Sequence, residues 1–354
     1  MGHLDRMTDS TGLIQHAIYC IPRRESGYTI DDNTRALRLC VRLWSRRPDE
    51  RMLDRVTRYL SLLEYARRPV GGFHNLMSYQ RQWLDTDAGG DCQGQAVRAL
   101  AEVLASRLPE PFVLLARELI CSAIPTLAGL RSLRAQAYIV LACGRLWEAG
   151  VEGVEKFEEV AVSAAQQLVE CYQRSQRPGW NWFESRMTYA NAVLPHAMLI
   201  AAGRWPDGPF YTIGREAFKF LEDQTMVEGV FWPIGNNGWY SHSEPKARYD
   251  QQPIEAVAMA DAALTAFKLT AEQAYLELLE RTHAWFHGSN SLGMAMADVN
   301  SGACCDGLQL SGLNRNQGAE STLAYLWTHV HLGEADRECT LPRLMVPGRG
   351  SAVV

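Results

Sequence analysis

Six segments of the sequence open with polar, often acidic, residues and continue as helical patterns of apolar residues. The openings lie roughly 45 to 65 residues apart, which is the length of two helices and two loops. A period of this size is typical of a repeated supersecondary unit, and here it predicts helical hairpins in a closed ring. The polar helix starts would gather at one end of the ring, where we expect the chemistry. The openings begin at Thr29, Asp91, Arg131, Thr188, Tyr249 and Asn314.

Apolar residues recur at helical spacing through most of the chain, and strand signals are confined to the loops. The pattern predicts an all-α (α/α)6 toroid, in which twelve helices form six hairpins with long loops on the active face. Charged helices should lie in an outer ring, and helices rich in Ala, Leu and Met in a buried inner ring. The predicted outer helices include 50–66, 153–174 and 271–287, and the inner ones include 131–149, 190–203, 251–267 and 316–332. The remaining predicted helices are 30–45, 92–107, 110–126, 209–224 and a short one near 10–19.

Composition narrows the protein class. No Pro-, Gly- or Ser-rich linker divides the 354 residues, so we expect one toroid domain over 1–335 and a tail at 336–354. The net charge of -5 gives no electrostatic reason to expect nucleic acid. Apolar runs are too short to span a membrane and no apolar leader opens the chain, which predicts a cytoplasmic protein without membrane insertion. Nine cysteines, an odd number and mostly within helical patterns, favour reduced thiols, and we expect no metal and no cofactor.

Four long loops, at 67–91, 175–189, 225–249 and 288–315, exceed typical connections and are predicted to be functional. Aromatic faces stack on the C–H faces of pyranose rings, while amide and guanidinium groups bind the hydroxyls, so these loops predict an oligosaccharide or glycan substrate. The alternative is that some aromatic residues plug the mouth of the ring. The candidate stacking residues are Trp180, Trp182, Trp232 and Trp239. The other candidate binding residues are Tyr28, Arg35, His74, Asn75, Arg81, Tyr189, Asn191, Asn236, Asn237, Gln251, Gln252, Glu255, Asn316, Gln317 and Glu320.

Several of these motifs resemble one protein family. They are Thr8 to Ala17, Gly27 to Asn33, Gly72-Phe73-His74-Asn75 followed by Tyr79 and Trp83, Gly307-Leu308, and Asn314 to Leu326. The segments resemble the six-hairpin glycosidase-like family that is often fused to, or encoded beside, bacterial retaining glycosyltransferases of the GT-B type. The resemblance implies an (α/α)6 fold, a role with mannose-type or related glycans, and a glycosyltransferase encoded nearby as a possible partner. The chain itself has no alternating strand–helix pattern and so no transferase domain.

The sequence departs from that family at two positions. The family pattern has an aspartate between the residues that match Tyr189 and Asn191, where this chain has Ala190. It also has an acidic residue before Asp91, where this chain has Gly90. A catalytic role at position 190 is therefore doubtful.

A glycosidase needs one protonated carboxylic acid and one carboxylate that acts as base or nucleophile. Glu184 is the predicted general acid because no helix cap explains it and the neighbouring tryptophans should raise its pKa by desolvation. We expect it to face a helix-start aspartate across the cavity. The aspartates considered are Asp31, Asp32, Asp91 and Asp250.

Each carboxylate also has a structural interpretation. An aspartate at a helix start commonly serves as an N-cap, although two adjacent acids at 31 and 32 exceed what one cap requires. Glu255 and Glu320 lie one turn inside apolar helices, where a buried ion pair or hydrogen bond could hold the rim.

Several histidines are compatible with a second class of enzyme, the sugar epimerases and isomerases. His74 and His242 lie in the predicted active-face loops and His196 lies on an inner helix. Sugar 2-epimerases of the same fold use histidines to move a proton at carbon, so an epimerase or isomerase is the alternative to a hydrolase. A non-catalytic glycan-binding partner of a glycosyltransferase is the third possibility, favoured by Ala190 and Gly90. His283 and His287 are spaced i, i+4, but no third metal ligand is near them in the sequence and their helix should be an outer one.

Overall fold

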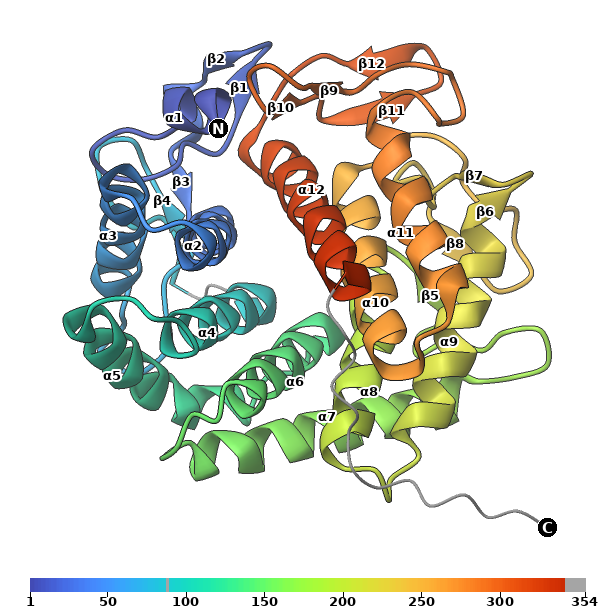
Figure 1. The fold of residues 1–354 in the computed structure, drawn as a ribbon, viewed down its shortest axis with the longest axis horizontal. Coiled ribbons are helices and arrows are strands. Elements are labelled where there is room, and N and C mark those ends of the chain that lie inside the picture. The colour runs from blue at the N-terminus through green and yellow to red at the C-terminus, as the bar shows by residue number, and fades with distance from the viewer. Residues whose placement is uncertain (87–88, 341–354) are drawn as a thin grey trace.

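The computed structural model describes residues 1–86 and 89–340, and it forms a ring of helices (Figure 1). Each inner helix packs against the next, and the last one contacts the first, so the inner ring is closed. The inner helices are α2 (Ile30–Arg46), α4 (Gly89–Leu104), α6 (Leu133–Glu148), α8 (Val193–Arg204), α10 (Pro253–Thr270) and α12 (Ala319–Thr340). All six polar openings lie at the starts of these helices, which confirms the predicted toroid.

Five long helices pair with the inner ring from outside, and a short helix fills the sixth outer position (Figure 1). They are α3 (Glu50–Tyr65), α5 (Glu110–Leu127), α7 (Glu155–Ser175), α9 (Phe210–Thr225), α11 (Gln273–Phe286) and α1 (Gly2–Met7), which packs on α12. The predicted helix near 10–19 is wrong. That segment is extended because Asn33 of α2 binds its backbone: Leu13 N donates to Asn33 Oδ1 at 2.8 Å, and Asn33 Nδ2 donates to Leu13 O at 3.1 Å.

Small residues let the inner helices approach closely. A Cβ at Gly94 of α4 would lie 2.9 Å from Tyr138 Cβ of α6, and one at Gly144 would lie 2.2 Å from Ile200 Cγ2 of α8. Thirteen of the 18 residues of α10 are buried, as expected for a helix that is apolar on most sides. The inner ring is therefore a packed core that holds its polar helix starts in fixed positions.

Short antiparallel strand pairs organise the long loops. Two pairs join different loops: β3 (Tyr28–Thr29) pairs with β4 (Leu76–Met77), and β5 (Arg186–Met187) pairs with β8 (Tyr240–Ser241). These pairs tie the loops to the rim where the inner helices begin. The other pairs are hairpins: β1 (Ala17–Ile18) with β2 (Ile21–Pro22), β6 (Met226–Val227) with β7 (Val230–Phe231), β9 (Ala297–Asp298) with β10 (Ala303–Cys304), and β11 (Gly307–Gln309) with β12 (Gly312–Asn314).

Helix α12 continues to Thr340, past the predicted domain end at 335, and the rest of the predicted tail, 341–354, lies outside the described residues. Within 1–86 and 89–340, no helix combines the length and the apolarity needed to cross a membrane.

Candidate active site

The start of α2 places two acidic residues and one arginine on the rim. Thr29 is the N-cap: its hydroxyl accepts from Asp32 N at 3.2 Å and donates to Asp32 Oδ2 at 2.7 Å. Asp31 and Asp32 are thus free of the capping role that sequence reasoning had to consider. One turn later, Arg35 pairs with both, at 3.0 Å to Asp31 Oδ2 and 2.9 Å to Asp32 Oδ1.

A third carboxylate reaches the same guanidinium from the other end of the chain. Glu320, in the first turn of α12, places Oε2 3.1 Å from Arg35 Nη1. We call Asp31, Asp32, Arg35 and Glu320 the Arg35 cluster. It confirms that Asp32 and Glu320 lie on the same face of the toroid, because one arginine contacts both.

Two of the three carboxylates hold their protons more tightly than usual. Burial raises the pKa of Glu320 to about 7, with Arg35 opposing and the nearby acids adding to the rise. Burial likewise raises the pKa of Asp31 to about 6 against the opposing charge of Arg35. Yet 38% of the Glu320 side chain and 25% of the Asp31 side chain remain exposed, and Glu320 also lines a cavity inside the ring. Asp31 Oδ1 is itself buried, and no donor among the described residues lies within hydrogen-bonding distance of it.

Glu184 occupies a neighbouring cluster and is ion-paired. Arg134 of α6 donates to Glu184 Oε2 at 2.9 Å, to Thr188 Oγ1 at 2.8 Å and to the Tyr189 carbonyl at 2.7 Å. Tyr189 OH donates to Asp91 Oδ2 at 2.6 Å, so Glu184 and Asp91 belong to one network on the rim. An arginine holds both Glu184 and Glu320, but the pKa of Glu320, which burial raises to about 7, suits a proton donor.

Two other acidic candidates, Glu255 and Asp250, lie at or just before the start of α10. Glu255 is buried and accepts from Asn191 Nδ2 at 2.9 Å, and burial raises its pKa despite these hydrogen bonds. This is the hydrogen-bonded rim support that the sequence offered as its alternative role. Asp250 lies two residues before Gln252, the N-cap residue of α10, and adopts φ +57°.

Two of the four predicted stacking tryptophans are buried. Trp180 and Trp182 have no exposed surface, and Trp180 donates from Nε1 to the Glu184 carbonyl at 2.7 Å. A ring without exposed surface cannot stack on a sugar, so the prediction is wrong for these two residues, which pack the loop against the core. Trp232 and Trp239 are partly exposed, and Arg248 and Arg186 respectively lie over their rings.

Three predicted hydrogen-bonding residues are also buried in structural roles, which corrects their assignment to substrate: Asn191, which is completely buried against Glu255, and Tyr28 and Gln251. Tyr28 is 2% exposed and donates to Asp9 Oδ2 at 2.6 Å. Gln251 is completely buried: its Nε2 donates to the Arg248 carbonyl at 2.8 Å and to Ser291 Oγ at 2.9 Å, and its Oε1 accepts from Trp285 Nε1 at 3.1 Å.

The remaining candidates lie in the loops above the inner helices. Asn75 supports the Arg35 cluster because its Oδ1 accepts from Asp31 N at 3.1 Å. The His74 ring stacks on Trp83 with ring centroids 4.8 Å apart. Arg81, Asn236 and Asn237 are exposed, while Gln252, Asn316 and Gln317 are partly exposed.

Sequence reasoning missed Arg134, Tyr138 and Asp306. Arg134 was visible as a cation in a polar helix start, one turn from the rim. Tyr138, with Arg35, Ala190 and Glu320, lines a cavity of about 50 Å³ inside the ring. Asp306 accepts from Gly318 N at 2.7 Å, and burial raises its pKa. Its position beside the start of α12 depends on loop packing, which no sequence pattern indicated.

The structure gives a physical context for both departures from the family pattern. A Cβ at Gly90 would lie 3.0 Å from Ser132 Cβ and 3.2 Å from Ala135 Cβ, so α4 and α6 leave little room for an acidic side chain there. Ala190 adopts φ +45° and lines the 50 Å³ cavity, so an aspartate at this position would place its carboxylate at the cavity wall.

The histidines considered for proton transfer do not form a pair on the rim. His196 lies deeper in the ring, with Nε2 2.9 Å from Thr265 Oγ1. Among the described residues, no hydrogen bond or ion pair joins His74, His196 or His242 to the Arg35 cluster. His329 of α12 does approach His283 of the outer helix α11, at 3.4 Å between ring nitrogens, but no group of three or more His, Cys, Asp or Glu residues in the described parts of the chain could hold a metal ion.

Comparisons with known proteins show the fold. A Bacillus thermoamylovorans cellobiose 2-epimerase superposes with a TM-score of 0.73 at 12% identity, covering 95% of each chain. A GH76 α-mannanase from Bacteroides thetaiotaomicron gives 0.70 at 10% identity, covering 96% of this chain and 94% of its own. A D-mannose isomerase gives 0.69 at 13% identity over 95% of each chain. No protein-family model and no curated protein matches the sequence.

Proposed function

We propose that this protein is a glycoside hydrolase whose reaction takes place at the Arg35 cluster. The observation that carries the proposal is the meeting of three carboxylates on one arginine, where the two with raised pKa values remain partly exposed. Glycosidic bond cleavage requires one acid that keeps its proton near neutral pH and one carboxylate that does not.

We assign the two roles by pKa and by hydrogen bonding. Glu320 donates its proton to the glycosidic oxygen as the bond to the anomeric carbon breaks. Asp31, whose side chain is 25% exposed, accepts a proton from the water that attacks that carbon. Arg35 holds both carboxylates in place, and Asp32, bound by Thr29 and Arg35, fixes the orientation of the guanidinium.

The substrate we propose is a bacterial oligosaccharide or polysaccharide of the mannose type or a related glycan. The cavity of about 50 Å³ has room for water but not for a sugar ring, so the glycan would bind at the open rim. Tyr189, which is 39% exposed and fixed by its bond to Asp91, and the partly exposed Trp239 are the aromatic surfaces for it.

The proposal is tested with a panel of defined oligosaccharides, including mannose-containing ones. New reducing ends, followed with time, would identify hydrolysis, and the anomer first formed would separate inversion from retention. The same reactions in D2O test the alternative, because a sugar 2-epimerase would introduce deuterium at carbon without new reducing ends. Saturable binding without either reaction would instead indicate a non-catalytic glycan-binding partner, for which a glycosyltransferase is the candidate.

The pH dependence of turnover is a specific expectation of this assignment. Below about pH 6, Asp31 is protonated and cannot accept a proton, and above about pH 7, Glu320 loses the proton it must donate. We therefore expect a narrow bell-shaped profile of kcat/KM with its maximum between these values. Its two limbs give the apparent pKa values of Asp31 and Glu320 as a coupled pair. A rate that stays constant from pH 5 to 9 would contradict the assignment of both groups.

A further inference from the structure

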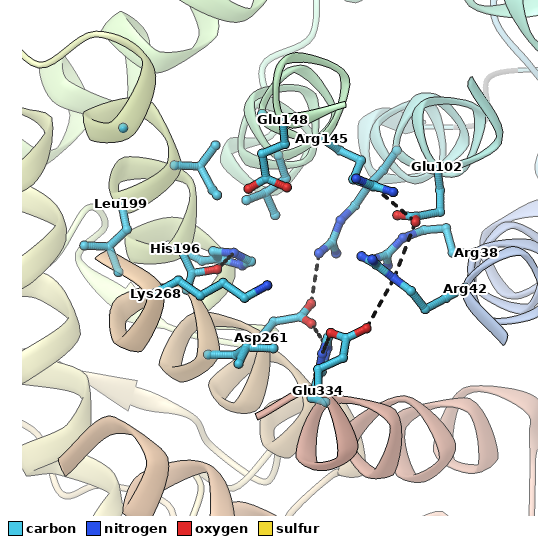
Figure 2. Close-up of a pocket in the computed structure, with 18 of the residues that line it drawn as sticks. Arg38, Arg42, Glu102, Arg145, Glu148, His196, Leu199, Asp261, Lys268 and Glu334 are labelled. Atoms are coloured by element: carbon cyan, nitrogen blue, oxygen red, sulfur yellow. Dashed lines mark hydrogen bonds and ion pairs between the residues drawn. The ribbon is translucent and has the colours of Figure 1, made fainter. Parts of the chain in front are cut away.

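A second cavity lies within the ring, among residues from the middle and the C-terminal ends of all six inner helices (Figure 2). Its volume is about 170 Å³. Arg38, Arg98, Asp261 and Trp327 line both this cavity and the smaller one beside the Arg35 cluster. Because Arg35 and Glu320 lie at the N-terminal ends of their helices, the larger cavity extends toward the opposite face of the toroid.

Three of the four acidic residues around this cavity are already paired. Asp261 binds Arg98 at 2.9 Å and also contacts His331. Glu102 lies 3.2 Å from Arg145. Glu334 forms ion pairs with Arg46 at 2.8 Å and with Arg42 at 3.5 Å. These contacts, some of which are dashed in Figure 2, leave little negative charge for any other cation.

Arg38 is the exception among the arginines of the cavity. Its side chain is only 7% exposed, and no acceptor within 1–86 and 89–340 lies within hydrogen-bonding or ion-pair distance of its guanidinium. Its close contact is the ring of Trp327, 4.9 Å from the guanidinium carbon. Burial lowers the pKa of Arg38 to about 9; the charges of Arg98 and Arg42 add to the effect, and the more distant charges of Asp261 and Glu102 oppose it.

Burying the Arg38 guanidinium without a partner destabilises the fold, because the charge loses its hydration and gains no ion pair in return. A bound anion would supply that ion pair. A helix end does not explain Arg38, since it lies in the middle of α2, far from the C-terminal carbonyls that stabilise cations. Arg145 and Lys268, by contrast, lie in the last turns of their helices. Among the described residues, four arginines (Arg38, Arg42, Arg98 and Arg145) and four acids (Glu102, Glu148, Asp261 and Glu334) line the cavity, and Arg38 is the arginine that none of these acids pairs with.

We propose that this cavity binds a small phosphate monoester, such as a monosaccharide phosphate, through an ion pair between its phosphate and Arg38. Arginine presents a planar fork of donors that matches phosphate oxygens. The volume is below the range of about 300 to 1,000 Å³ typical of sites for drug-sized ligands, which disfavours a nucleotide or an oligosaccharide. Burial lowers the pKa of His196 to about 3, so this cavity-lining imidazole is neutral and suited to a sugar hydroxyl.

Isothermal titration at constant ionic strength tests the site with three probes: inorganic phosphate, glucose 6-phosphate and glucose. We expect saturable binding of glucose 6-phosphate, at least as tight as that of inorganic phosphate, and none of glucose. Binding of inorganic phosphate alone would overturn the monoester as the ligand. Arg38→Met should weaken phosphate binding at least tenfold, and Glu148→Gln, which removes an exposed acid from the cavity wall, should strengthen it.

Glu184→Gln is the matched control, because it removes a carboxylate that lines neither this cavity nor the smaller one, and phosphate binding should not change. In chloride buffer, Arg38→Met should melt at or above the wild-type temperature, since it removes an unpaired buried charge. If that variant does not fold, Arg38→Lys replaces it, because lysine keeps the charge but loses the fork. Absence of saturable phosphate binding, or an unchanged Kd in the Arg38 variant, would overturn the proposal. None of these measurements depends on hydrolysis at the rim, so the two proposals fail separately.

Discussion

Glu320→Gln is expected to lower kcat by about 10²- to 10⁴-fold, the usual contribution of a general acid, while glycan binding changes little. Glutamine keeps the size of the side chain and can still accept a hydrogen bond from Arg35, which pairs with Glu320 at 3.1 Å. It has no proton to give to the leaving oxygen. Steady-state kinetics on the oligosaccharide that the panel identifies, together with titration of the same glycan, separate the effect on kcat from the effect on binding.

Two comparisons make this expectation specific to proton donation. An aryl glycoside with an acidic phenol as leaving group needs little protonation, so the variant should lose much less rate on that substrate. Glu184→Gln is the matched variant on the neighbouring network, where the carboxylate is held by Arg134 at 2.9 Å. Loss of turnover in Glu184→Gln with full activity in Glu320→Gln would contradict this assignment and show that Glu184 is the general acid, as predicted from the sequence.

Trp180→Ala is expected to destabilise the protein by about 3–5 kcal/mol, the cost of removing a large aromatic side chain from a core. The ring is completely buried and makes edge contacts with Phe220 and Tyr240 at centroid distances of 5.5 and 5.1 Å. The substitution also leaves the Glu184 carbonyl without the donor at 2.7 Å. Chemical denaturation followed by circular dichroism measures the change.

Trp239→Ala is the control for this effect, because Trp239 is partly exposed and its Nε1 bonds only to Asn236 in the same loop, at 2.7 Å. We expect it to change stability by less than about 1 kcal/mol and to weaken glycan binding if its ring serves as a sugar platform. Equal stability losses in the two variants would contradict the distinction between a buried plug and an exposed platform.

The spacing of residues within α2 determined part of the site in advance. Asp31 and Asp32 precede Arg35 by four and three residues, and side chains at that spacing lie on one face of a helix. The polar openings likewise predicted the inner helix starts, because burial on all sides requires an apolar sequence and exposure at the rim allows a polar one. These features are local, so the sequence alone carried them.

The partners that complete the site were not visible in the sequence. Glu320 meets Arg35, 285 positions earlier in the sequence, because the ring closes between α12 and α2. Glu184 was predicted as the acid from its tryptophan neighbours, but the side chain of Arg134, from another hairpin, pairs with it. Contacts of this kind depend on how whole helices pack, so the sequence of one segment does not show which residue of another segment will pair with it.

The sequence by itself therefore determined the toroid, the face that carries the polar helix starts and the acidic character of that face. The tertiary structure decided which carboxylates share Arg35, which tryptophans are buried and that Arg38 faces a cavity without an acidic partner. The physical reason is that helical periodicity is fixed within a few residues, whereas burial and the pairing of charges depend on segments that come together only when the ring closes.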